Sequence, residues 1–216
     1  MLSAIWIGLG LVVTKALART WVGTVDHQFA SWLAEDRTPL LNELSRIGSM
    51  LGQTVVKLLV TVVFAAVTGY LLRSWRPPVF ICMATLLEGA VFITVTWLVA
   101  RPRPDVVRLE DVTVSSSFPS GHAGAAAAYA AIAVVAFQHT RATWIRALTI
   151  VLAAAVPVIV GWARMYRGAH YLTDVVAGIL LGVTCVIACY LVMERCVGYP
   201  GGQRTRDPAV PTGGPR

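Results

Sequence analysis

The chain has 216 residues, of which 56% are hydrophobic and only 13% are charged. Because an average soluble domain carries roughly 25% charged residues, this composition argues against an ordinary soluble protein. A chain this apolar is not disordered either. The net charge of +7 would fit a nucleic-acid-binding protein, but the basic residues lie in short clusters between apolar runs and form no basic stripe. The composition therefore indicates a membrane protein with no nucleic-acid partner.

Six apolar runs are long enough to cross a membrane as helices, since a hydrocarbon core of ~30 Å needs about 20 apolar residues. We therefore expect an all-α polytopic membrane protein, with one six-span domain over residues 1–197. The remaining tail, 198–216, is rich in glycine, proline and charge, and is predicted to be disordered. The predicted spans lie at about 2–18, 52–72, 78–100, 122–138, 147–163 and 173–193.

The first run is predicted to be a retained helix rather than a cleaved secretory signal. No basic residue precedes the apolar stretch, whereas Lys15 and Arg19 follow it, which reverses the order in a signal peptide. The next segment, residues 19–51, places apolar side chains at helical spacing among charged ones. One or two short helices lying at the membrane surface are expected there.

The charges of the loops do not decide the orientation by number alone. Eight cations lie in the tail and in the links between spans two and three and between spans four and five, and nine lie on the opposite side. Cytoplasmic loops usually carry the excess of Lys and Arg. If four of those nine cations are there because they take part in catalysis, only five remain as topology signals on that side. Both termini are then expected to be cytoplasmic. The opposite side then faces the outside of the cell membrane.

Three polar clusters interrupt the apolar chain, at residues 101–104, 119–122 and 164–174. All three are expected on the same side of the membrane, because spans four and five both cross it between the second and third clusters. This holds whatever the absolute orientation is. Clusters that converge on one face are what a functional site requires.

The second cluster has the features of an anion site at a helix start. Pro119 suits the beginning of a helix, and Ser120 and Gly121 offer a hydroxyl group and unhindered N–H groups at the positive end of the helix dipole. A routine helix cap, with His122 merely at the membrane interface, is the alternative for this cluster taken alone.

The third cluster has the spacing Arg-x5-His-x3-Asp, formed by Arg164, His170 and Asp174. If His170 opens the sixth span, Asp174 lies one turn later on the same face. A carboxylate there can accept a hydrogen bond from one imidazole nitrogen and leave the other free as a nucleophile. The planar guanidinium of Arg164 suits phosphate oxygens. A His–Asp pair at a helix end, with arginines among lipid headgroups, is the alternative.

Together, and in this order, the clusters resemble the three-part signature of the type 2 phosphatidic acid phosphatase superfamily, which includes bacterial membrane lipid phosphatases. The family's second motif is complete in Ser120-Gly121-His122 with its preceding proline. The third motif is matched by the arginine, histidine and aspartate named above, with Ala163 where the family usually has serine.

The first motif of the family, Lys-x6-Arg-Pro, is matched only in part. Arg103 and its following proline are present, but Thr96 stands in the place of the lysine. Arg101, Arg167 or Lys57 could supply the missing cation, and we expect Arg101 to do so. The loss of this charge also raises a second hypothesis, a catalytically impaired member that binds or moves lipid phosphates.

The resemblance implies phosphoryl transfer through a phosphohistidine, with neither a metal nor a cofactor. His170 would attack phosphorus, Asp174 would orient and stabilise it, and His122 would protonate the leaving oxygen and then activate water. The sequence agrees with a metal-free reaction, since the clusters offer cations and no group of carboxylates for Mg²⁺. The residues implied to hold the phosphate oxygens are Arg103, Ser120, Gly121 and Arg164, with Arg101 as the further cation.

The expected substrate is a lipid phosphate whose tail stays in the bilayer, because the site is at the membrane edge and the chain has almost no soluble domain. Phosphatidate, phosphatidylglycerophosphate and a polyprenyl phosphate or diphosphate all remain open, and the lost lysine slightly favours a monophosphate. A transporter or channel outside this family would place charges along a path through the bilayer. Here the cations gather at one face.

One charged residue lies inside each of the second and third predicted spans, Lys57 and Glu88. Glu88 is costly in lipid and is by default a functional candidate, although a protonated, hydrogen-bonded carboxyl within the bundle is the interpretation that we favour. Lys57 lies about five residues inside the outer edge of the second span, so its side chain could instead reach outward to the headgroups. The polar link of residues 105–118 suggests a lid or a substrate-access loop.

Overall fold

The computed structural model describes residues 1–111 and 114–199, and the regular structure of these residues is entirely helical, which confirms the predicted all-α class. Disorder was predicted for the tail, residues 198–216. From residue 200 onward this tail lies outside the described residues. The elements are α1 (Leu2–Leu11), a π-helical turn (Val12–Ala16), a 3-10 turn (Leu17–Arg19), α2 (Trp21–Glu35), α3 (Pro39–Met50), α4 (Thr54–Leu72), α5 (Arg76–Val99), α6 (Gly121–Ala128), α7 (Ala130–His139), α8 (Thr143–Tyr166) and α9 (Leu172–Val197).

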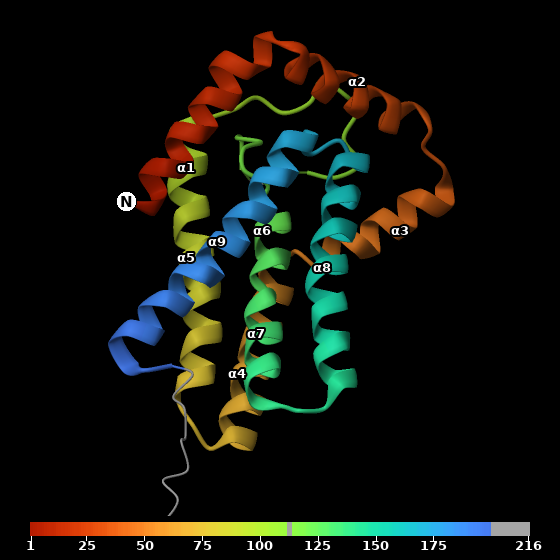
Figure 1. Cartoon of the computed structure of the whole chain (residues 1–216). Coiled ribbons are helices and arrows are strands. Elements are labelled where there is room, and N and C mark those ends of the chain that lie inside the picture. Colours follow the sequence, from red (N-terminus) through yellow and green to blue (C-terminus); the bar gives the residue numbers. More distant parts are fainter. Residues whose placement is uncertain (112–113, 200–216) are drawn as a thin grey trace, which may run out of the picture.

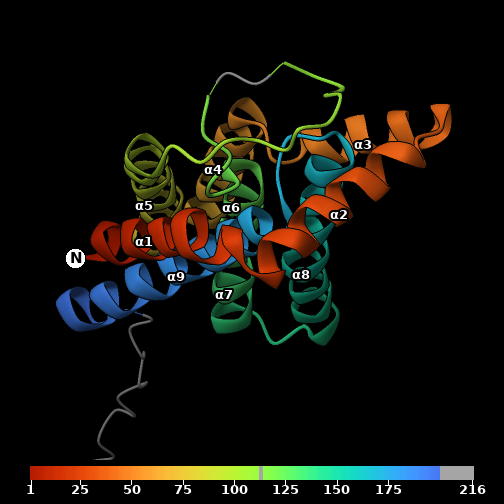
Figure 2. The ribbon, with the colours of Figure 1, turned by 90° about the horizontal axis from the view of Figure 1, so that it is seen from above.

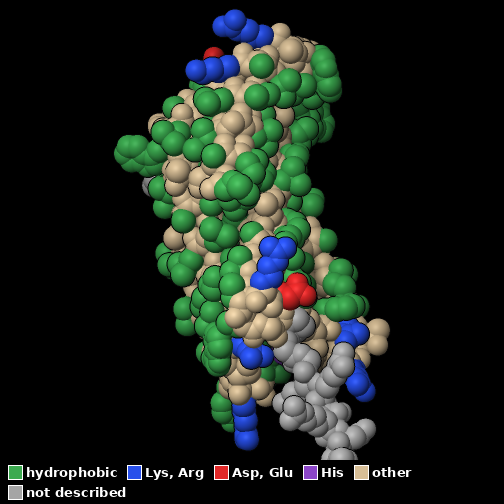
Figure 3. Space-filling view, turned by 60° about the vertical axis from the view of Figure 1, so that its left-hand side comes forward, with side chains coloured by type: hydrophobic (Ala, Val, Ile, Leu, Met, Phe, Trp, Pro, Cys, Tyr) green, Lys and Arg blue, Asp and Glu red, His purple; other side chains and the backbone are tan. Residues whose placement is uncertain are grey.

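Six helical segments in the described residues are long and apolar enough to cross a membrane, as predicted. The first comprises α1 and the two turns that follow it, and the fourth comprises α6 and α7, which are separated at Tyr129. Val55, Leu59 and Val62 of α4 are each more than half exposed, as expected for side chains that face lipid. Figure 3 shows hydrophobic side chains over most of one face, with charged side chains towards its two ends.

The two short helices expected between the first and second spans are present as α2 and α3. Each begins at a threonine whose hydroxyl oxygen accepts a backbone N–H, Thr20 from Val22 and Thr38 from Leu41, at 3.3 Å in both cases. Figures 1 and 2 show α2 lying across one end of the bundle, and α3 packs against α8. Their location at the membrane surface remains a prediction.

The centre of the bundle is α6, whose close contact with α9 depends on small residues. Its residues 123–128, all alanine or glycine, are buried. A Cβ atom at Gly178 of α9 would collide with the carbonyl oxygen of Ser120, and one at Gly182 would collide with that of Gly124. Small residues spaced four apart therefore let the two backbones approach each other closely.

The three polar clusters meet at one end of this bundle. Figure 1 shows that α6 and α9 begin there, and that the described parts of the segment between α5 and α6 cross over the same end. The carbonyl oxygen of Asp174, in the first turn of α9, accepts the N–H of Ser120 at 2.9 Å. The predicted convergence of the clusters is therefore a feature of the fold.

Candidate active site

A cavity of about 380 Å³ lies among the three polar clusters, at the beginning of α4 and α6 and the end of α8. Five of the eight predicted site residues line this cavity, while Arg101, Ser120 and Asp174 lie behind its wall. The five lining residues are Arg103, Gly121, His122, Arg164 and His170.

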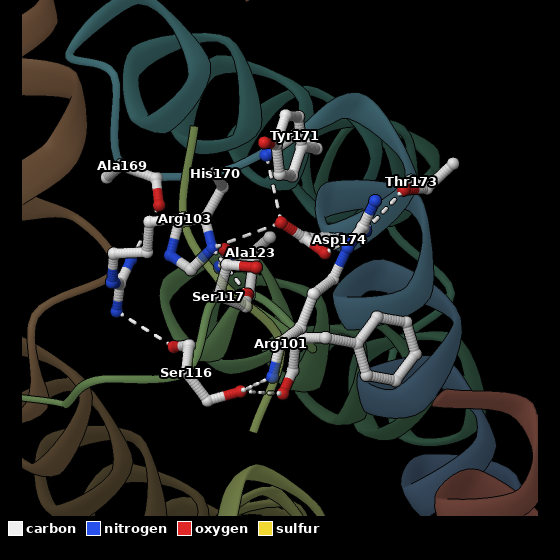
Figure 4. Close-up of polar contacts among 12 residues, drawn as sticks. Arg101, Arg103, Ser116, Ser117, Ala123, Ala169, His170, Tyr171, Thr173 and Asp174 are labelled. Atoms are coloured by element: carbon white, nitrogen blue, oxygen red, sulfur yellow. Dashed lines mark hydrogen bonds and ion pairs between the residues drawn. The ribbon is translucent and has the colours of Figure 1, made fainter. Parts of the chain in front are cut away.

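His170 lies in the turn between α8 and α9, with one ring nitrogen held by the backbone (Figure 4). Its Nδ1 is 2.7 Å from the carbonyl oxygen of Ser117. A carbonyl oxygen only accepts, so Nδ1 carries the proton and Nε2 keeps its lone pair. Asp174 Oδ2 is 3.9 Å from the same Nδ1, beyond hydrogen-bond distance. The expected direct hydrogen bond from His170 to Asp174 is therefore replaced by one to Ser117.

His170 is uncharged at neutral pH because of where it lies. Burial lowers its pKa well below the usual value, and the positive charges of Arg164 and Arg103 lower it further, although the Ser117 carbonyl opposes them. A neutral imidazole with a free Nε2 has the form that nucleophilic attack requires.

Asp174 is fully buried in the first turn of α9, where it accepts the Tyr171 N–H at 2.9 Å. Its other oxygen lies 2.5 Å from Arg101 Nη1, and Arg101 Nη2 lies 2.9 Å from Asp26 Oδ2 on α2. Arg101 thus joins α2 to α9 through two carboxylates and does not line the cavity. The structure gives Arg101 a different place from the phosphate-binding one expected from the sequence.

Arg103 and Arg164 present cations to the cavity from different segments. Among the described residues, the guanidinium of Arg103 donates to three carbonyl oxygens, those of Val114, Ser116 and Ala169, at 2.5 to 3.2 Å. These neutral partners hold the side chain rigidly without cancelling its charge. Arg164 donates to Ser49 Oγ at 3.0 Å and forms an ion pair with Glu110.

Glu110 places a carboxylate at the rim of the cavity, between two arginines. Besides its ion pair with Arg164, it accepts from Arg167 Nε at 2.7 Å. The positive charge of Arg167 is therefore paired with the carboxylate of Glu110. An anion already pairs with Arg164 where a phosphate oxygen would be expected.

The beginning of α6 forms the floor of the cavity. Ser120 is fully buried, and its Oγ lies 3.5 Å from the Ala123 N–H that it caps, so its contact with a phosphate stays a prediction. A Cβ at Gly121 would lie 2.6 Å from the Phe92 ring, so a larger residue there would have to displace that ring. The first N–H groups of a helix have no intrahelical partner, which leaves those of Gly121 and His122 available to an anion.

Thr96, at the family's lysine position, does not line the cavity. It is buried, and its hydroxyl lies 3.5 Å from the Phe118 carbonyl oxygen. Lys57 of α4 does line it, with its Nζ 2.9 Å from Glu88 Oε2 on α5. Glu88, for which a protonated carboxyl was favoured, therefore faces a cation within the bundle.

Several partners of the site have little or no signal in the sequence. The Ser117 carbonyl belongs to the backbone, and nothing in a side-chain pattern marks it. Asp26 lies on an amphipathic helix where acidic residues are ordinary, and only its burial identifies it. Glu110 belongs to the link that was predicted to act as a lid. Residues 1–111 and 114–199 contain no group of three His, Cys, Asp or Glu side chains arranged to hold a metal ion.

Comparison with known proteins agrees with this architecture. Residues 51–197 match the model of the PAP2 superfamily. The chain is 27% identical to phosphatidylglycerophosphatase B of Bacillus subtilis (strain 168) over 175 residues, which are 80% of this chain and 85% of that protein.

Two solved structures share the fold. A transmembrane PAP2-type phosphatidylglycerolphosphate phosphatase from Bacillus subtilis superposes with a TM-score of 0.79 at 25% identity, over 92% of this chain and all of the other. LpxE of Aquifex aeolicus superposes with a TM-score of 0.56 at 26% identity, over 75% of this chain and 92% of its own.

Proposed function

Since the chain belongs to the PAP2 superfamily, whose relatives include membrane lipid phosphatases, we propose that it hydrolyses an amphiphilic phosphate through a phosphohistidine on His170. One observation carries this proposal. Around one cavity lie a buried histidine with its Nδ1 proton fixed, a second histidine and two arginines. This set can supply a nucleophile, a proton donor and cations for phosphate oxygens.

In the first step, Nε2 of His170 attacks phosphorus in line with the leaving oxygen. A P–N bond forms, the P–O bond to the lipid breaks, and His122 in its protonated form gives its proton to the departing alkoxide. In the second step, His122 takes a proton from water, whose oxygen attacks phosphorus and breaks the P–N bond. Inorganic phosphate leaves, and both histidines return to their initial state.

Charge on the phosphoryl oxygens is balanced by Arg103, Arg164 and the N–H groups at the beginning of α6, with Ser120 as a further donor after a small local movement. Asp174 acts on His170 from 3.9 Å, where its negative charge stabilises the imidazole as positive charge develops on it. Arg101 keeps this carboxylate in place and is a positioning residue in this account. These groups supply the stabilisation without a metal ion.

The substrate that we propose is a lipid phosphate. The first candidates are the monophosphates phosphatidate, phosphatidylglycerophosphate and polyprenyl phosphate, and polyprenyl diphosphate is a further one. The names of the relatives support a lipid phosphate. We place the reaction at the extracytoplasmic face of the cell membrane, following the loop charges. The cavity is at one end of an apolar bundle, so a tail can remain in the bilayer while the headgroup reaches His170.

The test is phosphate release from a panel of these lipids by the purified protein in EDTA, alongside His170→Ala and His122→Ala. The parent protein is expected to release phosphate, His170→Ala none, and His122→Ala about 10²- to 10⁴-fold less than the parent, as for loss of a general acid. Undiminished release by His170→Ala would exclude the mechanism. Lipid binding without release by the parent would favour the impaired member of the family.

A further inference from the structure

Lys57 has an unusual position for a lysine of a membrane-spanning helix. It lies in the first turn of α4, where the positive end of the helix dipole disfavours a cation. At that level its long side chain could reach outward to the headgroups. Instead it turns inward to line the cavity, its side chain only 13% exposed and its Nζ 2.9 Å from Glu88 Oε2. Such a position requires an explanation.

Two glycines lie close to Lys57 or to the beginning of its helix. An added Cβ at Gly89 of α5 would already lie 3.6 Å from Nζ, so a longer side chain there would compete with the ammonium group for space. At Gly52, just before α4, a Cβ would lie 2.7 Å from the His122 carbonyl oxygen. This close contact holds the beginning of α4, and Lys57 with it, against the beginning of α6.

The other candidates for the missing cation have different partners. Arg101 pairs with Asp26 and Asp174, Arg167 pairs with Glu110, and neither arginine lines the cavity. Position 96 carries a neutral threonine that faces a backbone carbonyl. Among the residues that line the cavity, Lys57 adds a third cation to Arg103 and Arg164, from a third element of the fold.

We propose that Lys57 binds the substrate phosphate, supplying from α4 the charge that the family's first motif supplies from α5, while its ammonium group stays paired with Glu88. This inference rests on the proposed function. Glu88 is fully buried and contacts Lys57 through one oxygen. Among residues 1–111 and 114–199 Nζ has no other hydrogen-bond partner, so its two other hydrogens can donate to phosphate oxygens.

The experiment measures the binding of orthovanadate, a phosphate mimic, by calorimetry in detergent. Because Lys57→Met alone leaves a buried unpaired carboxylate, the informative variant is Lys57→Met/Glu88→Gln, which removes both charges. Glu88→Gln alone keeps the cation. Lys15→Met, which removes the chain's other lysine outside the cavity, is the matched control, and thermal unfolding checks the fold of each variant.

The dissociation constant for vanadate is expected to rise about tenfold or more in the double variant, which corresponds to about 1.4 kcal/mol. It should stay within about threefold of the parent value in Glu88→Gln, since an ammonium group released from its partner still lies beside the cavity. Lys15→Met should match the parent. If the ion pair between α4 and α5 has only a structural role, the double variant and Glu88→Gln should have the same dissociation constant for vanadate. That result would overturn the inference.

Phosphate release separates this inference from the proposed function. If the parent hydrolyses lipid phosphates and the double variant binds vanadate as Glu88→Gln does, the role of Lys57 is wrong and the reaction stands. If the parent binds vanadate in a Lys57-dependent way but hydrolyses nothing, the anion site stands and the reaction is wrong.

Discussion

His170 has two neighbours whose roles differ from those that its spacing suggested. The Ser117 carbonyl fixes the proton on Nδ1, and Asp174 acts from 3.9 Å as a charge held by Arg101. The tautomer therefore depends on a backbone segment that follows Arg101 in the chain, rather than on the residue one turn further along α9. A carbonyl group keeps this tautomer at any pH at which the protein is folded, because it does not titrate.

The depressed pKa of His170 predicts a loss of stability in acid. The folded state holds the imidazole neutral well below pH 6.5, whereas the unfolded chain takes up a proton near that pH. Unfolding is therefore favoured as pH falls through the unfolded value, by about 1.4 kcal/mol at one unit below it. We expect the parent to lose more stability than His170→Gln between pH 7 and 5.5, measured by unfolding in detergent. An equal loss in both proteins would contradict the burial of a neutral imidazole.

At the scale of helices, the contact between α6 and α9 aligns the second and third motifs. Ser120 and Asp174 are joined through their backbones at this contact, directly beside Gly178. The positions of His122 and His170 relative to each other therefore depend on how closely the two helices approach.

Gly178→Ala is predicted to reduce both stability and activity. The added methyl group would collide with the Ser120 carbonyl, a backbone atom that cannot rotate away, and such overpacking costs about 1–3 kcal/mol. Gly8→Ala is the matched control, because no atom of the described residues lies within 4 Å of a Cβ added at position 8. It should be neutral or stabilising by up to about 1 kcal/mol. Thermal unfolding and phosphate release of the two variants check this; a stable, fully active Gly178→Ala would contradict it.

The helices and the motif residues were predictable from the sequence because both depend on local patterns. Hydropathy alone identified six spans, and spacing identified the residues of the three clusters. The interruption of the fourth span at Tyr129 was not predicted, nor was the hydrogen bond from the Tyr129 hydroxyl to the Leu51 carbonyl oxygen, 78 positions away. The sequence did not predict which residues pair with Arg101 and Lys57. Ion pairs between helices depend on packing, which no local pattern contains.

At the scale of the whole molecule, the orientation depends on which cations are already engaged. Arg101, Arg103, Arg164 and Arg167 all have tertiary partners at the cavity end of the bundle. Because these four arginines serve the site, they should not be counted as signals of membrane topology. Without these four, five basic residues of the sequence remain for the cavity side and eight for the opposite side, the tail included, and this difference predicts cytoplasmic termini.

Cysteine labelling tests this orientation. Cys196 is free and exposed at the end of α9, and Val107 is exposed at the cavity end. A membrane-impermeant maleimide is expected to label Cys196 only after the cells are permeabilised. Val107→Cys in a Cys196→Ala background should react in intact cells. The opposite pattern would invert the topology and place the site in the cytoplasm.

The central claim, a phosphohistidine on His170, is tested most directly by the stereochemistry at phosphorus. A lipid monophosphate made chiral with three oxygen isotopes is offered to the protein with a small alcohol as phosphoryl acceptor, and the configuration of the product is determined. Two successive in-line displacements, first by His170 and then by the acceptor, invert the centre twice and predict net retention. Net inversion would show a single direct displacement, and would contradict the account.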